Sequence, residues 1–134
     1  MILDGQHIEL GDVIISDSKA VINKVEIPIN CITINSKDKK YSFTFWTQKE
    51  FHEFNKFPLN EKIDIIDMID DYDIDFSIES QFSLNTRENT KIYFTRIDDH
   101  KYIFNTIIND LDVGINNYKT LELEVVIDFI KDHK

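Results

Sequence analysis

Apolar and polar residues alternate along several segments of this chain, and a period of two is the pattern of strands with one buried face. The clearest run covers residues 121–129, where apolar side chains occupy every odd position. A helix over residues 124–132 is the alternative interpretation, because four apolar residues there also form a helical stripe. We favour a strand, since β-branched residues prefer strands and no capping residue precedes the segment.

The same pattern predicts that residues 8–46 are mainly extended. Apolar residues occupy the odd positions of segment 25–31 and then move to the even positions at Ile32 and Ile34. This change of phase predicts a bulge or bend near residues 31–32. Pro28 has no amide hydrogen to donate to a neighbouring strand, so we expect an edge strand or a kink at that point.

Two hairpins are predicted where a polar turn separates two strands. The first pairs residues 25–34 with residues 41–46. The second pairs residues 91–97 with residues 101–108 through the turn Asp98-Asp99-His100.

A short helix is predicted over residues 47–56. Thr47 and Glu50 fit a capping box, in which each side chain bonds the backbone amide of the other residue. Trp46 and Phe51 are placed for a hydrophobic staple across this helix start. We therefore expect the chain to leave its strand at Thr47.

A second helix is predicted over residues 61–72, with Asn60 as its N-cap. At 100° per residue, its apolar and acidic side chains fall on opposite faces. The apolar face contains Ile65, Ile66, Met68, Ile69 and Tyr72, and the acidic face contains Asp64, Asp67, Asp70 and Asp71. Residues 73–79 then return to a period of two and continue the acidic surface.

These elements predict an α+β fold in a single domain, residues 1–134, in which a mainly antiparallel β-sheet of about six or seven strands is packed by two short central helices. The hydrophobic fraction of 42% is sufficient for a packed core. No apolar run approaches the roughly 18 residues of a membrane span. The first residues do not resemble a signal peptide, and Cys31 is the single cysteine, so we expect a cytoplasmic protein.

The charge of the chain excludes several classes of partner. It contains 25 acidic and 15 basic residues, which gives a net charge of −10. Nucleic acids and anionic membranes attract basic proteins, so we expect neither as a direct partner. A compact polyanion instead attracts a basic protein, such as a toxin or a protein that handles nucleic acid.

The negative charge is concentrated in residues 61–80, where eight acidic residues stand against one lysine, a net charge of −7. Such a run is often no more than a solvated surface that keeps a protein soluble. Our hypothesis is that it forms a contiguous patch that binds a basic partner. The residues assigned to this patch are Asp64, Asp67, Asp70, Asp71, Asp73, Asp75 and Glu79.

Motifs for metals and cofactors do not fit. Residues 71–75 begin like a calcium loop, but Phe76 and Phe82 occupy the positions that require Gly and Glu. The four histidines have no partner at metal-binding spacing, and three scattered glycines form no phosphate-binding loop. We therefore predict no metal and no cofactor, and we expect Cys31 to be a small residue buried in the core.

Our leading functional hypothesis is a small acidic inhibitor, in first place an immunity protein that neutralises a basic toxin such as a nuclease. The alternative is an inhibitor encoded by a phage or mobile element and directed at a host nucleic-acid-binding or defence protein. A hypothesis of another class is a small enzyme whose site is assembled from distant residues, namely His52, Glu53, Asp99 and His100. A third is an accessory subunit, which a large exposed apolar patch would indicate.

Overall fold

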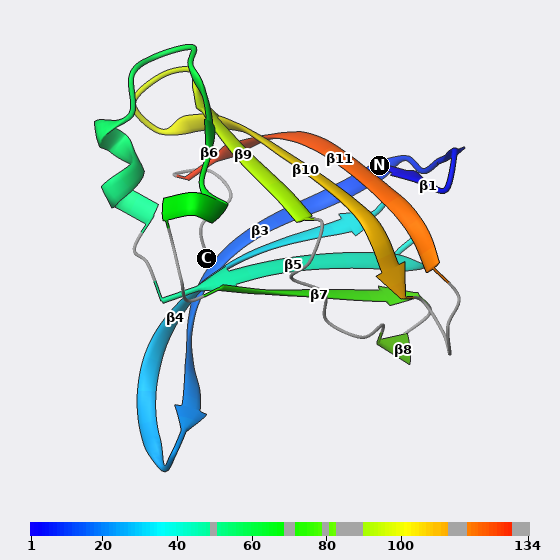
Figure 1. Ribbon diagram of the computed structural model, residues 1–134, viewed down its shortest axis with the longest axis horizontal. Helices are drawn as coiled ribbons and strands as arrows, with labels where there is room; N and C mark the ends of the chain where they lie inside the picture. The colour runs from blue at the N-terminus through cyan, green and yellow to red at the C-terminus, as the bar shows by residue number, and fades with distance from the viewer. Residues whose placement is uncertain (49–50, 69–71, 79–80, 83–89, 113–117, 130–134) are drawn as a thin grey trace.

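Two antiparallel β-sheets make up most of the computed structural model, which describes residues 1–134 apart from 49–50, 69–71, 79–80, 83–89, 113–117 and 130–134 (Figure 1). The six-stranded sheet has the order β2-β1-β11-β10-β9-β6, and the five-stranded sheet has the order β3-β4-β5-β7-β8. The strands of the first sheet are β1 (Ile2–Leu3), β2 (Gln6–His7), β6 (Lys62–Asp64), β9 (Thr90–Arg96), β10 (Lys101–Asp112) and β11 (Tyr118–Asp128). Those of the second are β3 (Leu10–Ile22), β4 (Val25–Ser36), β5 (Tyr41–Thr47), β7 (Tyr72–Ile78) and β8 (Gln81–Phe82).

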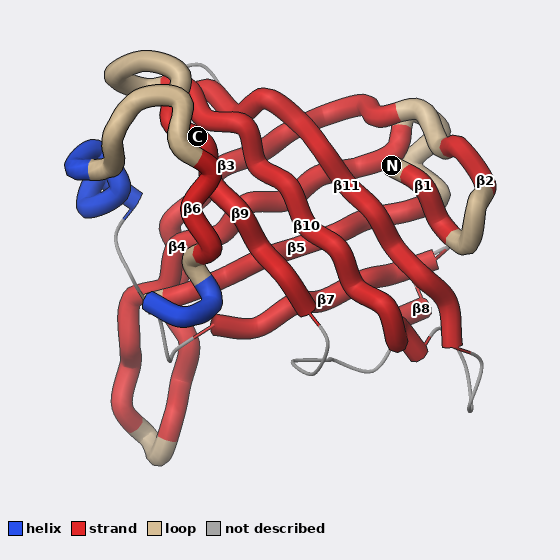
Figure 2. Tube along the Cα trace, turned by 45° about the horizontal axis from the view of Figure 1, so that its top comes forward, coloured by secondary structure: helices blue, strands red, loops and turns tan. Residues whose placement is uncertain are grey.

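The core lies between the two sheets, which face each other with their strands crossing (Figure 2). Side chains alternate between buried and partly exposed along β5, β7 and β9, as the period of two in their sequences requires. Aromatic rings join the sheets: Phe104 of β10 lies 6.1 Å from both Phe43 and Phe45 of β5, centroid to centroid. This geometry leaves the opposite side of each sheet as an outer face.

The strand predictions are confirmed. The hairpin β4–β5 pairs Ile34 with Phe43, and the hairpin β9–β10 pairs Phe94 with Phe104. Strand β11 runs to Asp128, so the helical alternative for residues 124–132 is wrong over its described part. Pairing with β10 along its whole length explains why the strand pattern prevails there.

The predicted α+β fold, with one mainly antiparallel sheet of about six or seven strands and two central helices, is wrong. The described residues form two antiparallel sheets, of six and five strands, and two short 3₁₀ helices. Thr47, the predicted N-cap, is the last residue of β5, fully buried and paired with Tyr72. A 3₁₀ helix, η1 (Phe51–Lys56), follows instead. A 3₁₀ helix has three residues per turn, so it places Phe51, Phe54 and Phe57 on one side, and all three are buried in the core. The spacing of these phenylalanines therefore explains the tighter helix.

The predicted staple also fails, because Trp46 lies on the outer face of β5 while Phe51 packs against the ring of Phe129 in the core at 5.3 Å. Glu50, the other half of the predicted capping box, lies outside the described residues.

The second predicted helix, over residues 61–72, is replaced by strand β6, the short 3₁₀ helix η2 (Ile66–Met68) and the start of β7. In β6, Ile63 pairs with Phe94 of β9, and the next residue but one, Ile65, is fully buried. β-Branched side chains suit a strand, and β9 offers a pairing partner. The carboxylate of Asp64 accepts a hydrogen bond from the amide of Ile66 (3.0 Å), which turns the chain out of the strand.

The predicted bulge near residues 31–32 is absent from the β3–β4 pairing, which runs in continuous register from Val13–Ile34 to Ile22–Val25. A register shift occurs instead between Leu10 and Val13. Pairing with β5 begins at Asn30, so among the described strands the earlier part of β4, with Pro28 opposite Lys19, pairs with β3 alone. Pro28 thus occupies a locally exposed edge, as predicted.

Residues 18–29 of the β3–β4 hairpin extend beyond the rest of the five-stranded sheet, and we call this segment the arm (Figures 1 and 2). Its turn consists of Asn23 and Lys24, both with positive φ (51° and 65°), which matches the twist of the two strands. Asp4 and Gly5 form a similar turn between β1 and β2.

Candidate partner-binding surface

The acidic residues assigned to the patch are divided between two sheets. Asp64 lies at the end of β6 in the six-stranded sheet, where its Oδ2 is 3.9 Å from Nζ of Lys91 and its Oδ1 accepts the amide of Ile66. Asp67 follows on η2 and is exposed. Asp64 and Asp67 therefore lie on different elements, and the carboxylate of Asp64 stabilises the local backbone through its hydrogen bond to Ile66.

Asp73 and Asp75 lie together on the outer face of β7 in the five-stranded sheet. Their neighbours along the strand, Tyr72, Ile74 and Phe76, are buried in the core, so the alternation directs both carboxylates outward. Asp70, Asp71 and Glu79 lie outside the described residues. Among the described residues, the structure thus brings Asp73 and Asp75 onto one face and places Asp64 in the opposite sheet.

The outer face of the five-stranded sheet places apolar side chains beside these carboxylates. Its register sets Cys31 of β4 next to Trp46 of β5, and Trp46 next to Asp73 of β7. In the next row, Thr33 Oγ1 and Thr44 Oγ1 are 3.2 Å apart, and Thr44 pairs with Asp75. The row Cys31–Trp46–Asp73 is therefore an apolar surface that ends in an acidic side chain.

Cys31 is half-buried on this outer face, and the expectation that it belongs to the core is wrong. Partial burial raises the pKa of the Cys31 thiol, and the carboxylates of Asp17 and Asp75 raise it further.

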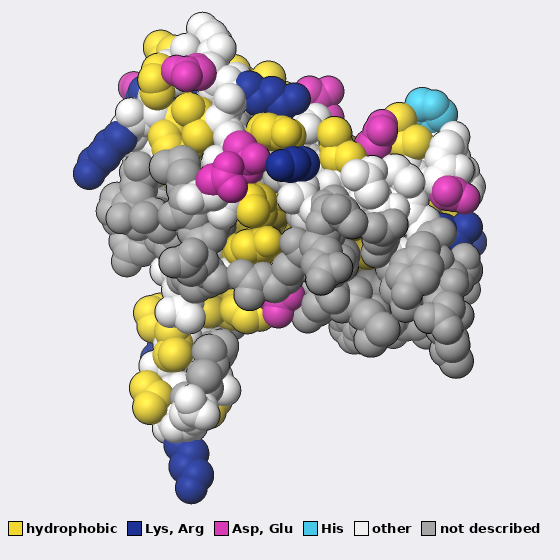
Figure 3. Space-filling view, viewed as in Figure 1, with side chains coloured by type: hydrophobic (Ala, Val, Ile, Leu, Met, Phe, Trp, Pro, Cys, Tyr) yellow, Lys and Arg dark blue, Asp and Glu magenta, His cyan; other side chains and the backbone are white. Residues whose placement is uncertain are grey.

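The apolar surface continues from Cys31 along β4 into the arm. Ile32 and Ile34 face the core, so the odd positions of β4 face the other way. We call Val25, Ile27, Ile29, Cys31 and Trp46 the outer stripe. Figure 3 shows hydrophobic side chains along the projecting arm. The change of phase in the sequence was the signal for this surface: it marks apolar residues on both faces of one regular strand.

The opposite face of the arm is more polar. The Nζ of Lys19 lies 3.6 Å from Oε2 of Glu26, and Pro28 stands opposite Lys19. Val21 is an exception, with 71% of its surface exposed. The two faces of the arm therefore differ in chemistry, although both strands continue a sheet whose inner face is apolar.

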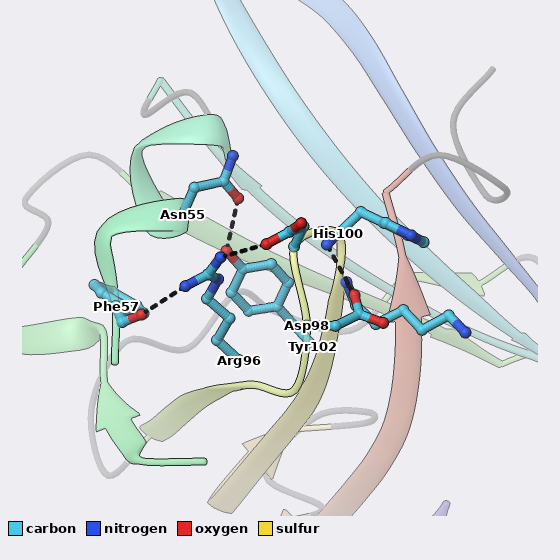
Figure 4. A network of polar contacts seen from close by, with 8 residues as sticks. Asn55, Phe57, Arg96, Asp98, His100 and Tyr102 are labelled. Carbon is cyan, nitrogen blue, oxygen red and sulfur yellow. Dashed lines mark hydrogen bonds and ion pairs between the residues drawn. The ribbon is translucent and has the colours of Figure 1, made fainter. Parts of the chain in front are cut away.

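A polar network lies at the β9–β10 turn, where the enzyme hypothesis placed Asp99 and His100 (Figure 4). Nη2 of Arg96 donates to Oδ1 of Asp99 at 3.0 Å, and Nη1 donates to the carbonyl oxygen of Phe57 at 3.2 Å. Tyr102 donates its hydroxyl to Asn55 Oδ1 at 2.9 Å. These contacts join the turn to η1 and the segment that follows it.

His100 and Asp99 do not form a pair with each other. Nδ1 of His100 is 2.9 Å from Oδ1 of Asp128 on β11. The amides of His100 and Lys101 both donate to Asp98 Oδ1 at 2.9 Å. The hydrogen bond from the His100 amide is the main cause that lowers the pKa of Asp98. These groups hold the ends of three strands together.

His52 and Glu53 belong to η1, and their side chains are outside the description. The structure therefore places η1 beside the β9–β10 turn through Asn55 and Tyr102 but gives no geometry for a site that combines all four residues.

Within the described ranges, no group of three or more His, Cys, Asp or Glu side chains is arranged to hold a metal ion. The helices of the described part are too short and too polar to cross a membrane. Comparisons with protein-family models, with curated proteins and with solved structures find no match to this chain.

Proposed function

We propose that this chain is a small acidic inhibitor that covers a basic surface of another protein, in first place an immunity protein that neutralises a basic toxin, such as a nuclease, in the cytoplasm. The observation that carries the proposal is the placement of Asp73 and Asp75 on the outer face of a sheet in a chain of net charge −10. Carboxylates that a sheet holds on one face attract the lysine and arginine side chains of another protein, and no change of conformation is required.

The physical basis of inhibition is occupancy. A basic surface that binds the phosphates of nucleic acid also attracts an acidic protein, and the two ligands then exclude each other. Opposite charges speed the encounter, and a matched arrangement selects the partner. An inhibitor of a host nucleic-acid-binding or defence protein would use the same surface, so the identity of the captured protein separates these two cases.

The test is affinity capture from a lysate of the source cells, with the immobilised chain as bait. We expect a basic protein to be enriched at low salt and lost at high salt, because screening weakens interactions between exposed charges. The captured protein is then produced alone, and its toxicity or nucleic-acid activity is measured with and without this chain. Inhibition in equimolar mixture supports the proposal.

Two variants of equal charge serve as matched baits. The first carries Asp67→Asn, Asp73→Asn and Asp75→Asn, and the second carries Asp12→Asn, Glu122→Gln and Glu124→Gln, which are exposed residues on β3 and β11. We expect the first variant to lose capture and the second to retain it. Equal capture by both variants, or enrichment of no basic protein by the unmodified chain, contradicts the proposal.

A further inference from the structure

The outer stripe is an apolar surface that the fold leaves partly exposed to solvent. Val25 is 59% exposed, and Ile27, Ile29, Cys31 and Trp46 are each partly exposed. From Val25 to Cys31 the stripe follows β4 for about 20 Å, at the usual rise per residue. Single exposed apolar residues are ordinary on protein surfaces, but a contiguous apolar row that ends beside an acidic side chain indicates an interaction site.

The arm carries most of this stripe, and β3 and β4 are the described strands that form it. The pairing of β4 with β5 covers Asn30 to Asn35, whereas residues 25–29 of β4 pair with β3. A two-stranded hairpin alone buries little apolar surface, so its apolar face remains in contact with water. Covering the stripe with another apolar surface therefore lowers the free energy, because it removes apolar area from water.

The charges around the stripe indicate what can cover it. Asp73 stands beside Trp46 in the sheet, and Asp75 lies in the adjacent row. Glu26 lies on the other face of the arm, where it forms an ion pair with Lys19. Asp73 and Asp75 lie on the same outer face as the stripe. A second copy of this chain brings the same carboxylates and another net charge of −10, so repulsion opposes self-association through this face.

We propose that the outer stripe is the docking surface for an apolar patch of the partner protein that is bordered by lysine or arginine side chains. This inference rests on the proposed function and adds the apolar contact that gives the chain its affinity for the partner protein. Carboxylates at the border steer the encounter, while the apolar row loses its contact with water. Trp46 is the anchor, since buried tryptophans carry a large share of the binding free energy in many interfaces.

The experiment uses a defined probe, a synthetic peptide of leucine and lysine patterned to form an amphipathic helix with lysines beside its apolar face. A second peptide with every leucine replaced by alanine has the same charge. Trp46 is the single tryptophan, so its fluorescence reports contact with the stripe. We expect the leucine peptide to shift Trp46 emission to shorter wavelength and to slow alkylation of Cys31, and the alanine peptide to bind at least about tenfold more weakly.

Two variants of the arm, one on each face, test where the peptide binds. Val25→Thr with Ile27→Thr removes apolar surface from the stripe but keeps β-branched residues, so the arm retains its strand preference. Val21→Thr is the control, because Val21 is more exposed than Val25 and lies on the opposite face of the same arm. We expect the double variant to lose affinity for the leucine peptide about tenfold and the Val21 variant to lose little.

The outcomes separate this inference from the proposed function. If Asp73→Asn with Asp75→Asn weakens peptide binding while Val25→Thr with Ile27→Thr does not, the acidic surface binds and the docking surface is overturned. If the alanine and leucine peptides bind equally, or Val21→Thr is as damaging as the double variant, the docking surface is also overturned. Sedimentation that shows a dimer abolished by the double variant assigns the stripe to self-association and overturns the proposed occupant.

Discussion

Phe104 shows at the scale of one residue what holds the two sheets together. Its ring is fully buried, 6.1 Å from Phe43 and Phe45 and 5.5 Å from Phe94. Phe104→Ala removes these contacts and leaves a cavity, so we expect the free energy of unfolding to fall by about 3–5 kcal/mol. Urea denaturation measures the loss. Val126→Thr, at an exposed position of β11, is the control and should change stability by less than about 0.5 kcal/mol; equal losses would contradict this account of the core.

Asp98 predicts a pH dependence of stability. The hydrogen bond from the amide of His100 lowers the pKa of this carboxyl below its ordinary value of 3.8. A carboxyl group whose pKa is lower in the folded state than in the unfolded state stabilises the protein at pH values above its unfolded-state pKa. This stabilisation is lost as the pH falls through the folded-state pKa. We therefore expect Asp98→Asn to lose less stability than the unmodified chain between neutral pH and a pH below 3.8, measured by urea denaturation.

Asp38 provides an independent check of the same effect. Its carboxylate accepts hydrogen bonds from the Ser36 hydroxyl (2.6 Å) and the Lys40 amide (2.9 Å), and the former is the main cause that lowers its pKa. Asp38→Asn should reduce the acid sensitivity of stability in the same direction. Acid sensitivity that is unchanged in both variants would show that these hydrogen bonds do not favour the charged forms.

At the scale of elements, two hairpin turns have the same shape but carry different residues at their second position, glycine in one and lysine in the other. Asp4-Gly5 and Asn23-Lys24 both have two positive φ angles, but the second turn places lysine where glycine has no steric cost. We expect Lys24→Gly to stabilise the arm by about 0.5–1 kcal/mol and Gly5→Lys to destabilise the β1–β2 hairpin by about 1 kcal/mol. Hydrogen exchange of the amides beside each turn measures both effects, and changes of the same sign would contradict the argument.

At the scale of the whole molecule, the excess of negative charge opposes the compact state. A chain of 134 residues with a net charge of −10 repels itself, and at 0.1 M ionic strength salt largely screens this repulsion between exposed charges more than about 10 Å apart. We therefore expect the urea midpoint to rise when sodium chloride is added at neutral pH. Asp67→Asn, a change at an exposed position on η2, should make this rise smaller. A midpoint that falls with salt would show that surface ion pairs outweigh the repulsion.

The sequence by itself determined several of the strands, two hairpins and the charge. Alternation with a period of two records which side of a strand is buried, and this local property is visible without knowing the partner strand. It therefore located β11 and the β4–β5 and β9–β10 hairpins. The Asp4-Gly5 turn carries a further local signal for a hairpin. Net charge follows from composition alone, so the acidic character needed no structure.

Tertiary structure decided which of two compatible patterns each central segment follows. Residues 61–72 have a helical period, but β9 offers Ile63 a strand partner, and the core between the sheets takes Ile65. Thr47 and Glu50 satisfy a capping pattern, yet pairing with Tyr72 keeps Thr47 in β5. Both choices depend on contacts between residues distant in sequence. The same reason separates Asp64 from Asp73 and Asp75, because the sheet that each strand joins is set by pairing and not by local spacing.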